Sequence, residues 1–338
     1  MLIICDLYRG KNWQGICKTR NSSTIKSRKM ENNSPIAIMV ACDNHYVVLL
    51  AALLKSIECN HKTGESVEVF IVDDGITSHN RKKLASSLGA GKMKLNWIPM
   101  DEAIPDHMTI PFDRSSYPKN IHTRIFIPHF IPERFEKIIY LDVDMILMRD
   151  ISDLWNIGLG DNMLAAVMDP RLKVFSNSWG GIMNYRELGF DPETKYFNTG
   201  ILVVNNKKWR EEESAATVVR CISDNEKYAN YPDQYGLNIV MANRWLELDP
   251  RWNSFADSAI PDPYIIHFIG RKPMYKTYDN REEFRKVFFE NLERTRWSGF
   301  RPLGESKRYM KKTVNILRKI PDFVRRLFSP ISFFEVLK

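Results

Sequence analysis

Two aspartates, Asp142 and Asp144, stand two positions apart, between an apolar run at residues 138–141 and a second one at 145–147. A carboxylate buried without a partner is costly, so an acidic pair at the mouth of a buried strand usually faces a cation. Mg²⁺ and Mn²⁺ take oxygen ligands, commonly one or two carboxylates together with phosphate oxygens of a substrate. The pair therefore indicates a metal ion that holds a diphosphate, although Asp is also common in solvated turns.

A histidine much later in the chain is a candidate third ligand. His267 follows a short apolar stretch, and Gly270 and Lys272 come soon after it. A glycine lets the backbone approach a phosphate closely, and a lysine supplies the positive charge that a phosphate needs. The alternative is a histidine that is simply buried and hydrogen-bonded in the core.

Other polar residues follow or interrupt apolar segments. Asp43 and Asn44 either begin a helix or bind a ligand, and Tyr46 nearby offers a ring on which a base can stack. Arg124 lies in an otherwise apolar segment, where an arginine usually pairs with an acid or a phosphate. Asp233 and the glutamine that follows it can equally start a helix, with Asp233 as N-cap.

These residues need a scaffold, and the chain alternates apolar strands with helices. Strands are expected at residues 36–41, 67–72, 95–98, 137–141, 164–167, 200–204 and 264–268. Helices are expected at residues 47–57, 78–87, 121–131, 212–223 and 234–241. This alternation predicts an α/β fold with a mostly parallel, Rossmann-like central sheet and helices on both faces. Such sheets bind ligands at the carboxyl ends of their strands, where several of these polar residues fall.

Charge is unevenly distributed along the 338 residues. The net charge is +8, yet residues 301–338 hold ten Lys or Arg against three Asp or Glu, and residues 1–34 hold seven against two. The remaining residues, 35–300, are therefore acidic overall. This excludes a nucleic-acid binder, which needs a basic patch on its folded domain. Five cysteines without a Cys-x-x-Cys pair suit a reducing cytoplasm, and no apolar run is long enough to span a membrane.

Three regions are expected from these patterns. Residues 1–34 are polar and aperiodic and are predicted to be disordered or a non-native extension, and residues 35–302 form the folded domain. Residues 303–338 form a basic, amphipathic helical tail, with Met310, Val314 and Leu317 on its apolar face. The tail either packs on the domain with its basic side in solvent or lies on an anionic membrane surface.

Taken together, these motifs resemble family 8 glycosyltransferases, and most of all bacterial lipopolysaccharide galactosyl- and glucosyltransferases of GT-A fold. The matching segments are residues 40–44, 140–144, 197–200, 206–210, 233–234 and 267–272. The resemblance implies a retaining transfer of galactose or glucose from a UDP-hexose to a saccharide acceptor, with Mn²⁺ or Mg²⁺. It also implies a role in lipopolysaccharide or surface glycan synthesis, a lipid-linked acceptor, and a cytoplasmic enzyme peripheral to the inner membrane face.

The resemblance also assigns roles to residues. The metal ligands would be Asp142, Asp144 and His267. The nucleotide-sugar would be held by Asp43, Asn44, Tyr46, Arg124, Asp142, Val143, Asn198, Gly200, Gly270 and Lys272. Asp233 would help to position the donor sugar, Gln234 would lie on the reactive face of the anomeric carbon, and Asp169 would border the acceptor pocket. Because residue 45 resembles an insertion, either His45 or Tyr46 could meet the uracil.

Two other functions are consistent with parts of the pattern. A haloacid-dehalogenase-like phosphatase would use Asp142 as nucleophile, but its motif belongs near the start of the domain, and here a nucleotide-binding half comes first. A membrane-docked module could bind a UDP-sugar without turnover. The intact acidic pair and His267 favour an enzyme.

Overall fold

The computed structural model describes residues 35–108 and 115–321. Two expectations lie outside these residues: the segment 1–34 and the last part of the tail, 322–338. The expected α/β architecture is confirmed over the part that is described, as the strands and helices below show.

Seven strands of the described residues form one sheet, in the order β3-β2-β1-β4-β7-β6-β8. They are β1 (Ile36–Asp43), β2 (Val67–Asp74), β3 (Met93–Pro99), β4 (Lys137–Leu141), β6 (Leu164–Met168), β7 (Phe197–Asn205) and β8 (Trp245–Glu247). Strand β7 is antiparallel to both β4 and β6, whereas the other neighbours are parallel. The predicted mostly parallel sheet is therefore present.

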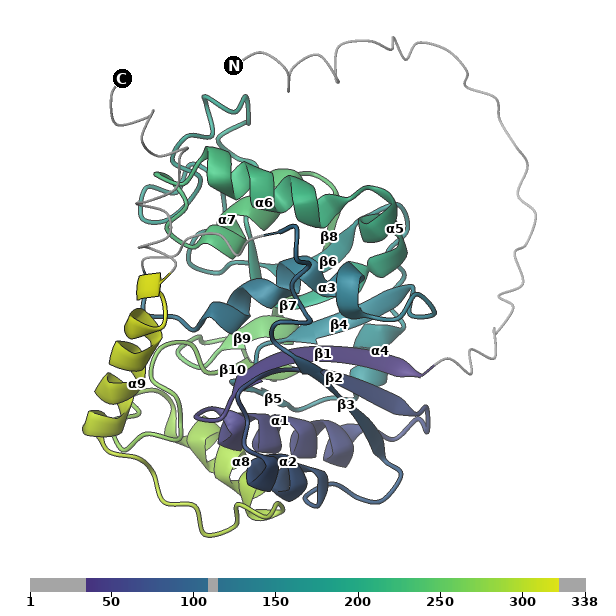
Figure 1. Ribbon diagram of the computed structural model, residues 1–338, viewed down its shortest axis with the longest axis vertical. Coiled ribbons are helices and arrows are strands. Elements are labelled where there is room, and N and C mark those ends of the chain that lie inside the picture. Colours follow the sequence, from purple (N-terminus) through teal and green to yellow (C-terminus); the bar gives the residue numbers. More distant parts are fainter. Residues whose placement is uncertain (1–34, 109–114, 322–338) are drawn as a thin grey trace, which may run out of the picture. The chain divides into compact units, whose positions relative to one another are not determined.

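Helices cover both sides of this sheet. They are α1 (Val47–Asn60), α2 (Ser78–Ala85), α3 (Ile127–Phe130), α4 (Ile151–Trp155), α5 (Asn206–Glu211), α6 (Ser214–Asp224), α7 (Pro232–Val240), α8 (Glu282–Glu293) and α9 (Glu305–Leu317), with the 3₁₀ helices η1 (Lys119–Phe126) and η2 (Pro250–Asn253). Figure 1 shows α1, α2 and α8 on one side of the sheet and α5, α6 and α7 on the other. Residues 47–57 of α1 are buried on every face, which explains why residues 47–54 are apolar without interruption rather than striped.

A second, small sheet positions the chemistry. Strand β10 (Ile265–His267) pairs with β5 (Met145–Leu147) on one side and with β9 (Ser254–Phe255) on the other. In the antiparallel β5–β10 ladder His267 lies opposite Met145, the residue after Asp144. This pairing places a late histidine beside the acidic pair.

Two predicted helices differ in detail from the sequence expectation. The helix expected at 121–131 is divided into η1 and α3, and Pro128 at the start of α3 lacks the N–H that a continuous helix would use. The helix expected at 212–223 begins at Ser214, because Glu213 has a left-handed backbone (φ 49°) that separates it from α5.

Helix α9 packs on the domain in an orientation that the sequence did not predict. It belongs to the same compact unit as the sheet, although a boundary was expected after Pro302. Its buried residues are Lys311 and Asn315. The exposed large apolar side chains of this segment are Tyr309, Met310, Val314, Ile316, Leu317 and Ile320. Lys311 and Asn315 therefore face the domain, whereas the apolar stripe is exposed together with Lys307 and Lys312. This differs from the first of the two expected placements, in which the basic side lies in solvent and the apolar side packs on the domain.

Candidate active site

A cavity of about 540 Å³ opens where β1 and β4 end. It is lined by most of the residues singled out from the sequence, namely Asp43, Tyr46, Arg124, Asp142, Val143, Asp144, Asp169, Asn198, Gly200, Asp233, Gln234, His267, Gly270 and Lys272. Asn44 is not among the lining residues, because its exposed side chain accepts hydrogen bonds from Thr77 N–H (3.0 Å) and from the Asn80 amide (2.8 Å) at the start of α2. The carboxyl ends of distant strands thus form one site, as expected for an open α/β sheet.

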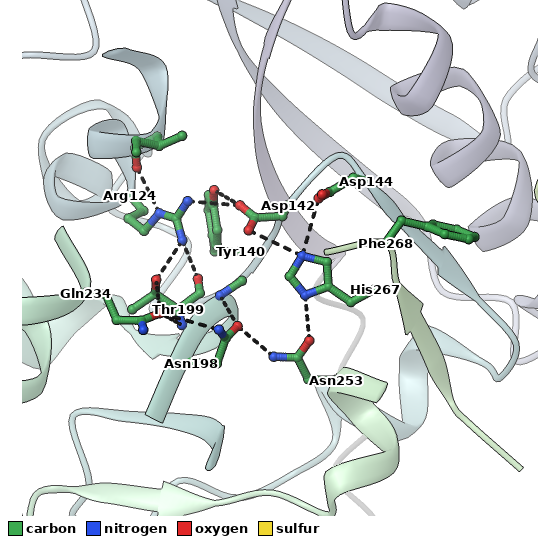
Figure 2. Close-up of polar contacts among 12 residues, drawn as sticks. Arg124, Tyr140, Asp142, Asp144, Asn198, Thr199, Gln234, Asn253, His267 and Phe268 are labelled. Carbon is green, nitrogen blue, oxygen red and sulfur yellow. Dashed lines mark hydrogen bonds and ion pairs between the residues drawn. The ribbon is translucent and has the colours of Figure 1, made fainter. Parts of the chain in front are cut away.

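The two aspartates and the histidine converge in this cavity (Figure 2). His267 Nε2 lies 3.4 Å from Asp144 Oδ1 and 3.8 Å from Asp142 Oδ2. One ligand atom from each of the three residues lies within 4.8 Å of the other two. Carboxylates with an imidazole are a donor set that a divalent ion such as Mn²⁺ accepts, so the residues present fit a metal ion.

Close packing holds this triad together. The Asp142 N–H donates to the Gly200 carbonyl at 2.8 Å, which places β7 directly beside the acidic pair. A Cβ at Gly200 would lie 2.5 Å from His267 Cε1 and 3.0 Å from both Asp142 Oδ2 and Asn198 Oδ1. Only glycine fits at this position of the strand.

Arg124 has the acidic partners that its apolar surroundings predicted. Its guanidinium is 4% exposed, lies 2.9 Å from Asp142 Oδ1 and 3.3 Å from Asp233 Oδ2, and donates to the Thr199 carbonyl at 2.6 Å. Burial and the charge of Asp144 raise the pKa of Asp142, although Arg124 opposes that shift. A divalent cation between the two acids would relieve the same repulsion.

Lys272 lies against Asp144 at the other side of the triad. Its ammonium contacts Asp144 Oδ2 and also donates to the Phe268 carbonyl at 2.8 Å. Burial alone would raise the pKa of Asp144, but the charge of Lys272 outweighs it and holds that pKa well below its usual range. Gly270 has a φ of +82°, a backbone conformation that favours glycine and lets the loop turn toward the cavity.

Gln234 and Asp233 lie at the start of α7. The helix N-cap is Tyr231 and Pro232 opens the first turn, so Asp233 is inside the helix, paired with Arg124, and the interpretation of it as an N-cap is wrong. Gln234 Oε1 accepts hydrogen bonds from Thr199 N–H (3.1 Å) and Thr199 Oγ1 (3.2 Å). The backbone N–H can only donate, so the carbonyl oxygen of this amide is directed into the protein.

Asp169 directly follows β6 and is only 4% exposed. Its Oδ1 accepts from the Arg171 and Leu172 N–H groups at 2.9 and 3.0 Å, and its Oδ2 accepts from Asn198 Nδ2 at 3.0 Å. Both oxygens are therefore engaged by neighbouring parts of the chain.

The opposite end of the cavity carries the residues expected at a nucleoside. Asp43 Oδ1 accepts from the His45 and Tyr46 N–H groups at 2.9 and 3.1 Å, and the Lys311 ammonium contacts Oδ2. Lys311 Nζ also lies 5.7 Å from the centre of the Tyr46 ring. His45 is not among the lining residues, and its Nε2 is hydrogen-bonded to the Tyr275 hydroxyl at 2.8 Å. Of the two uracil candidates, Tyr46 is the one that faces the cavity.

Several residues of the site were not predicted. Arg308, Lys312 and Asn315 come from α9, which the sequence placed outside the domain, and Trp179 is a 68% exposed aromatic in the loop after β6. Asn253, which contacts His267, is a single amide between Trp252 and Ser254 and carries no sequence signal. An exposed aromatic in a loop is the only one of these features that sequence could have flagged.

Comparison with known proteins agrees with this geometry. Residues 37–274 match the family described as Glycosyl transferase family 8. The chain belongs to this family, and it is a glycosyltransferase with a GT-A fold.

Similar proteins include bacterial relatives of different lengths. General stress protein A of Bacillus subtilis (strain 168) is 24% identical over 290 residues, which cover 80% of this chain and 97% of that protein. Glycosyltransferase GlyA of Streptococcus pneumoniae serotype 4 is 26% identical over 281 residues, which cover 79% of this chain but 36% of that protein.

Solved structures show the same fold. The galactosyltransferase LgtC in complex with donor and acceptor sugar analogues has a TM-score of 0.63 and 23% identity, and the match covers 78% of this chain and 99% of LgtC. The WbbM bifunctional glycosyltransferase has a TM-score of 0.65 and 21% identity, with 79% of this chain and 51% of that one covered.

Proposed function

We propose that this glycosyltransferase moves a hexose, galactose or glucose, from a UDP-sugar to a saccharide acceptor, with retention of configuration and with Mn²⁺ or Mg²⁺. The observation that carries the proposal is the convergence of Asp142, Asp144 and His267 in a cavity also lined by Lys272. The likeness to LgtC, a galactosyltransferase whose structure holds donor and acceptor sugar analogues, supports the substrate class.

The chain's own groups suit a leaving diphosphate. When bound, a divalent ion would be held by Asp142, Asp144 and His267 and would neutralise charge on the departing phosphates. Lys272 adds a second cation, and the loop at Gly270 brings backbone close to the phosphate. At the other end, Asp43 and Tyr46 hold the nucleoside by a carboxylate contact and by stacking.

The sugar would lie between these groups and α7. Arg124, Asn198, Gly200 and Asp233 position the donor hexose, and Asp169 borders the acceptor. Gln234 has a stabilising role, because an amide is a poor nucleophile and its oxygen already accepts hydrogen bonds from Thr199. The acceptor hydroxyl passes its proton to the departing phosphate oxygen, so the transfer requires no dedicated base.

The proposal extends to where the enzyme works. We place it in the cytoplasm, peripheral to the inner membrane face, acting on a lipid-linked acceptor in lipopolysaccharide or surface glycan synthesis. The outward apolar residues of α9, with exposed Lys307 and Lys312 on the same helix, support contact with anionic lipid. Among the described residues, no helix has the length and apolarity needed to cross a bilayer.

A panel of UDP-sugars with Mn²⁺, scored for slow donor hydrolysis, tests the function without knowledge of the acceptor. We expect turnover of UDP-galactose or UDP-glucose that EDTA abolishes and Mn²⁺ restores. Asp144→Asn should lower turnover by roughly 100-fold, since a lost metal contact costs several kcal/mol of transition-state stabilisation.

Other outcomes would replace the proposal. Phosphate release from small phosphoesters, with UDP binding intact in Asp142→Asn, would show a phosphatase. The Asp142 carboxylate is held by Arg124 and by the Tyr140 hydroxyl at 2.5 Å, which disfavours a nucleophile. Metal-dependent binding of UDP-sugar without hydrolysis or transfer over hours would show a binding module.

A further inference from the structure

We propose that Asn253 is a positioning residue, which fixes His267 in the tautomer and orientation that bind a metal ion through Nε2. The proposal rests on the metal-dependent function above. It concerns a chain of hydrogen bonds that runs from Asp169 through Asn198 and Asn253 to His267, part of which is drawn in Figure 2.

The direction of this chain is set by a backbone group. The Gly200 N–H can only donate, and it lies 2.9 Å from Asn198 Oδ1. Asn198 must therefore direct its carbonyl oxygen toward Gly200 and its NH₂ toward Asp169, where Oδ2 accepts at 3.0 Å. The Asp169 carboxylate is itself held by two backbone N–H groups, so this end of the chain is rigid.

The next link follows from the first. Asn198 Oδ1 is an acceptor, and the Asn253 side chain reaches it at 2.8 Å, so Asn253 must present its NH₂ there. The carbonyl oxygen of Asn253 then faces His267 Nδ1, also at 2.8 Å. A carbonyl oxygen only accepts, so Nδ1 carries the proton.

A neutral imidazole with its proton on Nδ1 has a lone pair on Nε2. Here that lone pair faces Asp144 Oδ1 at 3.4 Å and Asp142 Oδ2 at 3.8 Å. Lone pairs from three residues that converge in this way form a donor set that a cation among them would stabilise. Outer hydrogen bonds of this kind hold metal-binding histidines in place, and their loss typically weakens metal binding 10- to 100-fold.

Burial makes the arrangement specific. Asn253 is 1% and His267 3% exposed, and the Phe255 ring stands at 88° to the imidazole with 5.7 Å between ring centres. Water therefore has little access to replace the amide, and the ring is held from its side. Asn253 would act on the metal only through His267, since it does not line the cavity.

The test compares Mn²⁺ binding by calorimetry for the full chain and for Asn253→Ala and Asn253→Asp. We expect Asn253→Ala to bind Mn²⁺ about 10- to 100-fold more weakly. Asn253→Asp keeps an acceptor for Nδ1–H and should remain within about 5-fold of the wild type, a partial rescue consistent with a single retained hydrogen bond. Asn206→Ala is the matched control, because Asn206 is a fully buried amide bonded to the Phe135 carbonyl and does not line the cavity.

A spectroscopic readout separates positioning from general destabilisation. In protein labelled with ¹⁵N-histidine, the His267 signal, assigned by its loss in His267→Gln, should show the Nδ1–H tautomer in the wild type and a mixture in Asn253→Ala. Unchanged Mn²⁺ affinity and an unchanged tautomer in folded Asn253→Ala would overturn the role of Asn253 but not the proposed function. Equal weakening in the Asp and Ala variants would do the same. A wild type that binds no Mn²⁺ and turns over no UDP-hexose would instead overturn the proposed function.

Discussion

The ammonium of Lys311, on α9, lies against the carboxylate of Asp43, at the end of β1, and both side chains are buried. The same ammonium faces the ring of Tyr46. These are the two side chains that we propose hold the nucleoside, by hydrogen bonding and by stacking. In this conformation Lys311 therefore makes the contacts that a uracil base would make, and α9 covers that end of the cavity.

Replacing Lys311 should change how the protein responds to nucleotide. In Lys311→Ala the buried Asp43 carboxylate loses its partner, and breaking a buried pair costs roughly 3–5 kcal/mol. A bound uracil N–H would satisfy that carboxylate again. We therefore expect a lower Tm without ligand and a larger rise in Tm on addition of UDP and Mn²⁺ than in the wild type.

The control for Lys311 is on the same helix. Lys307→Ala removes an exposed lysine that has no contact with Asp43, so both its Tm and its UDP-induced shift should match the wild type. A UDP-induced shift in Lys311→Ala that equals or falls below the wild-type shift would show that Lys311 and the base do not compete for Asp43.

Gly200→Ala should separate metal binding from folding. The added methyl would contact His267, Asn198 and Asp142 at 2.5–3.0 Å, and overpacking of this kind costs about 1–3 kcal/mol. We expect a folded protein that binds Mn²⁺ at least about 10-fold more weakly, because the ligand geometry is displaced. Gly158→Ala, which adds a methyl in open space, should bind Mn²⁺ normally. Full Mn²⁺ affinity in folded Gly200→Ala would contradict the close packing of the triad.

Stability should depend on pH through His61 and Asp150. His61 Nδ1 and Nε2 face two acceptors, Asp150 Oδ1 (3.0 Å) and the Glu65 carbonyl (2.8 Å), so only the charged ring donates to both. Burial opposes that charge, but these hydrogen bonds raise the pKa of His61 above its ordinary value. Burial likewise opposes the Asp150 charge, yet hydrogen bonds from His61 and from the Ser152 and Lys62 backbone lower the pKa of Asp150 to about 2.

The directions of these two pKa shifts define the pH range in which the pair stabilises the fold. The contribution of Asp150 is present above its unfolded pKa and is lost as pH falls toward about 2. The contribution of His61 is complete below its unfolded pKa, near 6.5, and is lost as pH rises through its higher folded value. Asp150→Asn keeps a good N-cap for α4. It should lower the free energy of unfolding by roughly 1 kcal/mol at pH 5.5 but by less than about half of that at pH 8.5. Urea unfolding at both pH values measures this, and equal losses would contradict the pairing.

Membrane contact through α9 can be tested without removing the helix. A triple change of Met310, Val314 and Leu317 to Gln alters only exposed side chains and should leave Tm and donor hydrolysis unchanged. Each lost apolar side chain removes about 1.5–3 kcal/mol of burial in lipid, so binding to anionic vesicles in sedimentation should fall by more than 10-fold. Vesicle binding equal to that of the wild type would exclude this face as the lipid contact.

Sequence was sufficient for the parts of the fold with continuous apolar runs. Strands β1 and β4 and helix α1 each hold an uninterrupted apolar run next to polar residues, so their positions and the α/β class followed directly. The short strands β5 and β9 did not, because three and two residues carry no periodicity. Their existence depends on pairing with β10, which for β5 is a contact between distant parts of the chain.

The residues of the site can likewise be divided into those that the sequence predicted and those that it did not. The acidic pair, His267 and Arg124 carried signals of their own, as charged or titratable residues among apolar ones. Asn253 carried none, since a lone amide gains its role only from its neighbours in space. For helix α9 the sequence left two placements of the apolar stripe open, on the domain or on a membrane surface, and the buried ion pair of Lys311 with Asp43 could not be foreseen from either.

The β5–β10 ladder has a consequence for how the enzyme matures. Asp144 and His267 become neighbours only when β10 has paired with β5. This pairing cannot form until the whole segment between the two residues has been synthesised. During translation, a ribosome-bound chain that ends before β10 holds both acids but lacks their imidazole. If the proposed metal site is correct, the capacity to bind a divalent ion arises only after β10 has been synthesised and has paired with β5.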